Sequence, residues 1–85
     1  LANLIFKSKD YEKVAEEAKK AKNYLEQNLD SGYIILGPTA ANVFMMNKIY
    51  HFEISIKYKK ADLLVPVLKD LFTYTKVDLD IDFNF

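Results

Sequence analysis

The stretch Ile49-Tyr50-His51-Phe52-Glu53-Ile54-Ser55-Ile56-Lys57-Tyr58 decides the fold. Large apolar residues alternate along it with polar ones, and successive side chains of a β-strand point to opposite faces of the sheet. The pattern therefore predicts a strand with one apolar and one polar face. The apolar face would carry Tyr50, Phe52, Ile54, Ile56 and Tyr58. So large an apolar face needs a cover, and the helical stretches on either side of the strand in sequence can provide it.

Apolar residues recur at helical spacing from about residue 10 to residue 29, which predicts a first helix. Ser8 or Asp10 can cap its start, because their side-chain oxygens can accept hydrogen bonds from the free backbone amides there. A second helix is expected either to start close to Asp62 or to bend there, because Pro66 is tolerated only in a first turn. The predicted buried stripe of the second helix consists of Ala61, Leu64, Leu68, Leu71, Phe72 and Thr75.

Three further strands complete the pattern, at residues 1–7, 33–36 and from residue 77 onward. The last strand alternates with period two. Its inward residues are expected to be Val77, Leu79, Ile81, Phe83 and Phe85, and its outward residues Asp78, Asp80, Asp82 and Asn84.

The predicted element order is β-α-β-β-α-β. This order indicates an α+β fold of the ferredoxin-like, split βαβ type, with a four-stranded antiparallel sheet and two helices on one face. The right-handed crossover rule puts the first and third strands at the centre, in the order 4-1-3-2.

The composition indicates one domain spanning residues 1–85, with no cysteine, no arginine and a net charge of zero. No apolar run approaches the roughly 20 residues of a membrane helix, so no membrane contact is expected. The lack of cysteine fits a cytoplasmic location, which is the expected one. Leu1 is not an initiator methionine and lies inside a predicted strand. We therefore expect the sequence to be a fragment of a longer protein.

Residues 39–47 show no clear period and are expected to form an apolar loop. Two interpretations of its hydrophobic cluster remain open. The cluster either packs under the sheet or forms a docking patch for another domain or a partner. Its residues are Val43, Phe44, Met45 and Met46.

No catalytic constellation is evident, and neither a metal nor a cofactor is expected within these residues. His51 is the only histidine, and the spacing of Asp78, Asp80 and Asp82 lacks the glycine of a calcium loop, since Phe83 stands in its place. Bases are not expected to stack on the open sheet face, because the aromatic residues of the long strand share the face that the helices need. Contact candidates for a nucleic acid or a partner are Lys48, His51, Lys57, Lys59 and Lys60.

Three segments together carry a family resemblance: Leu36-Gly37-Pro38-Thr39-Ala40-Ala41, the stretch 49–58, and Asp80-Ile81-Asp82. Their order and spacing resemble the C-terminal domain of the primosomal protein N′ (PriA) family of replication-restart DNA helicases. That domain has a strand ending in LGP-x-x-A, an aromatic-rich strand of the type YRYQIxIK, and a final strand ending in DxDP. The resemblance covers essentially all 85 residues.

The resemblance implies a larger parent, an ATP-dependent helicase that acts in primosome assembly and uses ATP with Mg²⁺ and structural Zn²⁺ outside this segment. Implied partners are the helicase core of the same chain, DNA and the single-stranded-DNA-binding protein. Several positions differ from the family. Where the family often carries basic residues, this chain has Met45, Asn47, Ile49 and His51. Glu53 replaces the usual glutamine of the aromatic-rich strand, and Phe83 replaces the proline after DxD. We therefore expect only weak, phosphate-type DNA contact. The alternatives are a ferredoxin-like regulatory or scaffolding module that packs against its own chain, and a ribosomal-type RNA-binding domain.

Overall fold

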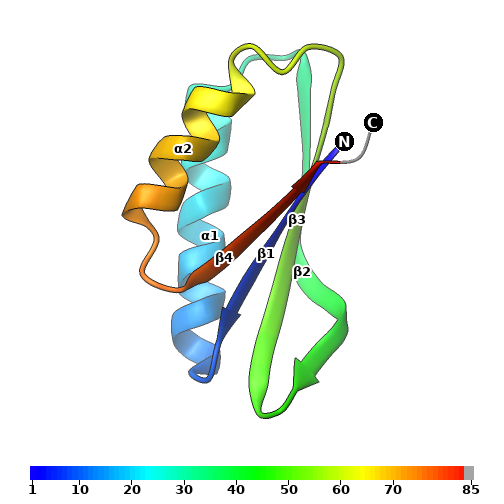
Figure 1. Cartoon of the computed structure of the whole chain (residues 1–85). Helices are drawn as coiled ribbons and strands as arrows, with labels where there is room; N and C mark the ends of the chain where they lie inside the picture. The colour runs from blue at the N-terminus through cyan, green and yellow to red at the C-terminus, as the bar shows by residue number, and fades with distance from the viewer. Residues whose placement is uncertain (84–85) are drawn as a thin grey trace.

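The computed structural model describes the backbone of residues 1–83 and the side chains of residues 1–40 and 47–83. It contains four strands and two helices in the predicted order (Figure 1). The elements are β1 (Ala2–Ser8), α1 (Tyr11–Asn28), β2 (Tyr33–Met46), β3 (Ile49–Tyr58), α2 (Leu64–Tyr74) and β4 (Asp78–Phe83). The predictions for Asn84 and Phe85 lie outside the described residues.

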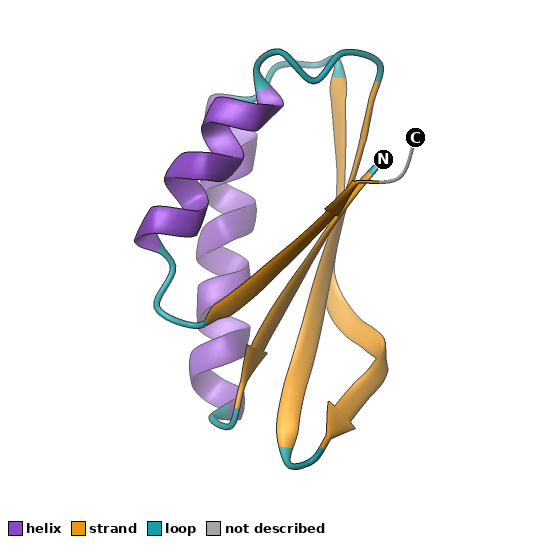
Figure 2. Cartoon of the chain, in the orientation of Figure 1, coloured by secondary structure: helices purple, strands orange, loops and turns teal. Residues whose placement is uncertain are grey.

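The strands form one antiparallel sheet in the order β2-β3-β1-β4, and both helices cover the same face (Figure 2). This is the predicted ferredoxin-like arrangement, with β1 and β3 at the centre. Ala2 of β1 lies opposite Ile56 of β3 and Phe83 of β4, so these three residues form one row across three neighbouring strands. The sheet prediction is confirmed.

The core lies between the sheet and the helices. Phe6 and Leu4 from β1, Ile54 and Ile56 from β3, and Leu25 from α1 are fully buried. Tyr50, Phe52 and Tyr58 are partly buried and pack against this core, as the alternation of the long strand predicts.

Both helices begin where their sequences allow. Asp10 caps α1, and its side chain accepts a hydrogen bond from the backbone N–H of Lys13 at 3.2 Å. Pro66 is the third helical residue of α2, whose N-cap is Leu63, so the proline lies in the first turn as predicted.

One prediction about packing is wrong. Phe72 was assigned to the buried stripe of α2, but it is 59% exposed, whereas Leu64, Leu68 and Leu71 of the same stripe are buried. The apolar side of α2 is wide, and Phe72 lies at its margin next to Val65, so the period alone does not show that the sheet leaves this margin uncovered. Phe83 faces the helix side of the sheet as predicted, opposite the buried Ala2, although it is 37% exposed because it lies on an outer strand.

The prediction of a loop at residues 39–47 is also wrong, because β2 continues to Met46. Its pairing with β3 shifts register between Leu36 and Thr39, and again between Ala40 and Met45. Each irregularity puts extra residues into β2, which disrupts the alternation by which a strand is recognised in sequence.

Candidate functional site

The open face of the sheet, opposite the helices, is rich in carboxylates along β4. Asp78, Asp80 and Asp82 are exposed, as predicted, and Glu53 of β3 lies on the same face. The lysines of this face are Lys7, which forms an ion pair with Asp80, and Lys57. This balance of charge makes the β4 side of the face unfavourable for a polyanion such as DNA.

His51 lies on this open face opposite Lys7 of β1 and is half-buried. Its Nδ1 atom is buried and has no hydrogen-bond partner among the described residues. This partial burial makes the contact candidate His51 less available to a ligand than the exposed lysines.

The predicted lysine contacts fall into two places. Lys48 lies in the two-residue turn between β2 and β3, where Asn47 and Lys48 have φ values of 54° and 65°. Lys57, Lys59 and Lys60 lie at or just beyond the other end of β3, and all three are exposed. Strand β3 spans roughly 30 Å at about 3.3 Å per residue, so these residues do not form a single patch with Lys48.

We define the lysine end of β3 as Lys57, Lys59 and Lys60. Tyr33 and Tyr58 fix the backbone at this end. The Tyr33 hydroxyl donates a hydrogen bond to the Lys60 carbonyl oxygen at 2.7 Å. The rings of Tyr33 and Tyr58 are 6.4 Å apart. A hollow of about 370 Å³ lies beside them, and its lining includes both Lys59 and Lys60.

Two carboxylates moderate the charge of this hollow. Asp30 and Asp62 also line it, and Asp30 is engaged by its own loop, accepting a hydrogen bond from the Gly32 N–H at 2.9 Å. Within the hollow the two carboxylates equal Lys59 and Lys60 in number, so the lysine end has an excess of one positive charge, which comes from Lys57 outside the lining. Such an arrangement can hold a phosphate weakly, as a set of point charges, and lacks the planar fork that arginine offers.

The predicted docking residues Val43, Phe44, Met45 and Met46 belong to β2, and Met45 lies opposite Tyr50 in the backbone register. Their side chains lie outside the described residues. Whether they cover the sheet or meet a partner stays a prediction.

Gly37 lies in the first register shift of β2, between Leu36 and Thr39, where the LGP segment runs beside β3. It has φ = +104°, and a Cβ atom placed on it would lie 2.7 Å from the carbonyl oxygen of Glu53. The following peptide bond to Pro38 is cis. Only glycine fits such a close approach with this φ value. The LGP segment and the long strand are thus in direct contact.

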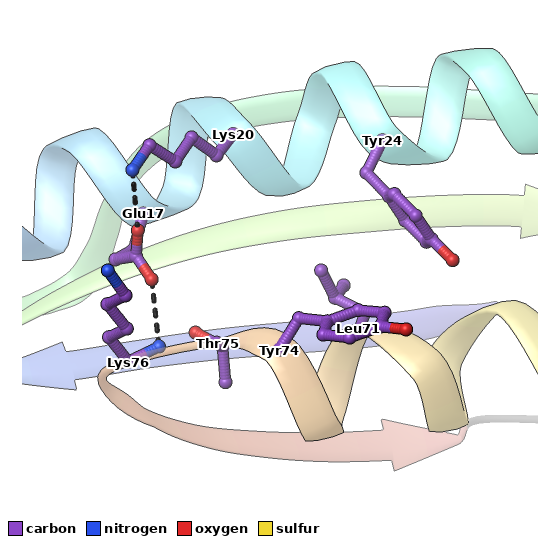
Figure 3. A pocket seen from close by; sticks show the side chains of 7 residues that line it. All are labelled: Glu17, Lys20, Tyr24, Leu71, Tyr74, Thr75 and Lys76. Atoms are coloured by element: carbon purple, nitrogen blue, oxygen red, sulfur yellow. Dashed lines mark hydrogen bonds and ion pairs between the residues drawn. The ribbon is translucent and has the colours of Figure 1, made fainter.

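A second hollow, of about 190 Å³, lies between α1 and the C-terminal end of α2 (Figure 3). Glu17 is 8% exposed and accepts a hydrogen bond from the backbone N–H of Lys76 at 2.8 Å. Its other oxygen lies 3.5 Å from the Lys20 ammonium. This carboxylate ties the connection between α2 and β4 to the long helix, which is a structural role.

The sequence analysis did not single out Glu17. The signal was present, because Glu17 lies three residues after Val14 and four before Ala21, both of which are buried. A carboxylate on the buried side of a helix indicates a fixed partner.

No group of three or more histidine, cysteine, aspartate or glutamate side chains in the described part of the chain could hold a metal ion. Among the described residues, no helix combines the length and apolar character needed to cross a membrane.

Comparison with known proteins supports the fold. No family model matches the chain, and no curated protein is similar enough to be matched. Among solved structures, the chain is similar to the de novo designed protein Foldit4, with a TM-score of 0.63 and 10% sequence identity over 99% of this chain and 96% of that one. At this identity the similarity concerns the fold alone.

Proposed function

We propose that this chain is a non-catalytic accessory domain of an ATP-dependent replication-restart helicase. In this role it helps to position DNA for a motor that lies elsewhere in the protein, through weak phosphate contacts. The lysine end of β3 makes these contacts. The single observation that carries the proposal is the exposure of Lys57, Lys59 and Lys60 at one end of β3, where Lys59 and Lys60 line a hollow beside Tyr33.

The geometry of the LGP segment also supports the proposal. In the family that the sequence resembles, the glycine precedes the aromatic-rich strand at a set distance. Here Gly37 lies close to the backbone of that strand at Glu53. This close packing explains why a glycine is needed at position 37 and why it lies at this distance in sequence from the strand. A role for the single-stranded-DNA-binding protein as partner belongs to the same proposal.

A scaffolding module is the second candidate, and one observation favours it. Ile34 and Leu36 are 55% and 47% exposed on the open face of β2. Neighbouring exposed aliphatic side chains on a sheet suit contact with another domain of the same chain. An RNA-binding sheet is less suited to this chain, because the aromatic residues of β3 pack toward the helices.

Titration of the domain with labelled single-stranded and forked DNA tests the proposal. Three phosphate contacts predict a slope of about −2 in a plot of log K against log salt for single strands, which is about a twentyfold loss of affinity between 50 and 200 mM salt. Replacing Lys57, Lys59 and Lys60 together with glutamine should abolish binding.

The matched control replaces Lys9, Lys13 and Lys19, three exposed lysines at the start of α1 or within it, and changes the net charge equally. This control should retain affinity within about twofold to threefold. Equal losses in both triple variants would show a response to net charge only and would refute the assignment. An absence of binding at 50 mM salt would refute DNA contact and favour the scaffolding module.

A further inference from the structure

Strand β4 is an outer strand of the sheet with a regular, unbroken edge. It pairs with β1 without a register shift from Asp78 to Phe83, and no described residue pairs with its other side. Half of the backbone N–H and C=O groups of such a strand point away from the sheet and can accept another strand.

The other outer strand, β2, differs from β4. Its pairing with β3 contains two register shifts. Bulges twist and interrupt an edge, which makes it a poor template for a further strand. Of the two edges, β4 is therefore the one prepared for pairing.

An apolar groove runs beside this edge, under α2. One hollow of about 440 Å³ lies between the two elements, and its lining includes Val65 and Phe72 from α2 and Ile81 from β4. A second hollow of about 480 Å³ shares Phe72 and continues along Val77 and Leu79. This second hollow is more polar, because Lys7, Asp78 and Asp80 also line it. Together the hollows follow β4 over its length, which suits an extended segment.

Phe72 is the main apolar surface of this groove. Its side chain is 59% exposed, and Val65, seven residues earlier on the same helix, is 39% exposed. A strand added beside β4 would place alternate side chains under α2, where they would cover both residues.

The remaining side chains of an added strand would point to the open face, next to the three aspartates of β4. Among the described residues, Asp80 is paired with Lys7, whereas no ion pair is found for Asp78 or Asp82. Two β4 strands of different copies would bring carboxylates close to one another, which disfavours self-association. The negative charge of these aspartates therefore favours an added strand that carries basic side chains.

We infer that the edge of β4 and the groove under α2 form a strand-addition site for an extended peptide segment of a partner protein, in which apolar residues alternate with lysine or arginine. The backbone of the segment pairs with β4, its apolar side chains fill the groove, and its basic side chains face Asp78, Asp80 and Asp82. None of the lysines proposed to contact DNA takes part.

The test uses a blocked nine-residue peptide in which lysine alternates with valine and isoleucine, titrated into the ¹⁵N-labelled protein. Two control peptides carry glutamate in place of every lysine, or proline at the central apolar position with the charge unchanged. The expected result is binding of the first peptide alone, with amide shifts concentrated in residues 78–83.

Two protein variants locate the site. Phe72→Ala should weaken binding about fivefold to tenfold, because it removes the central apolar contact, and the exposure of Phe72 indicates that the fold survives. Tyr74→Ala is the matched control, since Tyr74 is exposed on the same helix but lines the hollow near Glu17. Replacing Asp78 and Asp82 with asparagine should weaken binding about twofold to thirtyfold.

Equal binding of the proline peptide would show attraction by charge alone and would overturn the inference. Shifts concentrated in β2, or equal effects of the Phe72 and Tyr74 variants, would also overturn it. Sedimentation in the absence of peptide measures the oligomeric state. If the protein forms a dimer that cannot bind the peptide, the edge of β4 pairs with a second copy of the chain, and the inference of a basic partner is refuted.

Discussion

The Glu17 contact can be tested quantitatively by truncating its side chain. Glu17→Ala leaves the Lys76 N–H without its carboxylate acceptor, and hydrogen bonds to charged groups contribute about 1.5–3 kcal/mol. Lys76 is exposed, so water can replace part of the interaction. We therefore expect the lower end of the range, a loss of about 1.5 kcal/mol in the free energy of unfolding.

The ion pair with Lys20 should matter much less than this hydrogen bond. The Lys20 side chain is 61% exposed, and salt and water screen such pairs. Glu17→Gln, which keeps an acceptor for the Lys76 N–H, should therefore cost under about 1 kcal/mol. Glu16→Ala is the matched control, because Glu16 is exposed and contacts Lys20 alone among the described residues.

Urea unfolding followed by circular dichroism measures these differences. With a slope of about 1–2 kcal/mol per molar urea for a small domain, Glu17→Ala should lower the midpoint by roughly 1 M. An equal loss in Glu16→Ala would refute the hydrogen-bond argument. A loss in Glu17→Gln as large as in Glu17→Ala would show that the charge, rather than the acceptor, stabilises the connection.

Three further changes test the core, the strand junction and one titrating group. Phe6→Ala should cost about 3–5 kcal/mol, because Phe6 is fully buried, and calorimetry should show a large drop in Tm. Gly37→Ala should cost more than about 2 kcal/mol in urea unfolding, since φ is +104° and Glu53 lies in the way, whereas Gly32→Ala should cost under about 1 kcal/mol. Burial, and then the Asp70 carboxylate, raise the pKa of Tyr24, so its stabilising effect is complete below the unfolded-state pKa and is lost as pH rises through the folded-state pKa. The difference in phenolate absorbance between the protein and Tyr24→Phe should show this raised pKa, and Asp70→Asn should lower it.

Much of the fold could be predicted because local patterns and pairing rules agree. The alternation in residues 49–58 identified β3 and its buried face, and the crossover rule placed β1 beside it. The prediction failed where the pattern was irregular. Register shifts in β2 removed the period that identifies a strand, and the wide apolar side of α2 did not show that Phe72, at its margin, is exposed.

The candidate sites were less predictable, because they depend on how distant elements meet. The sequence analysis named Lys57, Lys59 and Lys60, which do gather at one end of β3, together with Lys48, which lies at the other end. The groove under α2 could not be foreseen, since its width depends on the separation of α2 from β4. The partner of Glu17 is a backbone group 59 residues away, and no local pattern identifies such a contact.

The central position of β1 has a consequence for the order in which the chain can fold. In Figure 1, the blue N-terminal strand lies between β3 and β4, whose residues come more than 40 positions later. Contacts between residues so far apart in sequence form slowly, since a long loop must close first. A growing polypeptide that ends before residue 49 has neither neighbour for its first strand, so the sheet must assemble late in synthesis or after it.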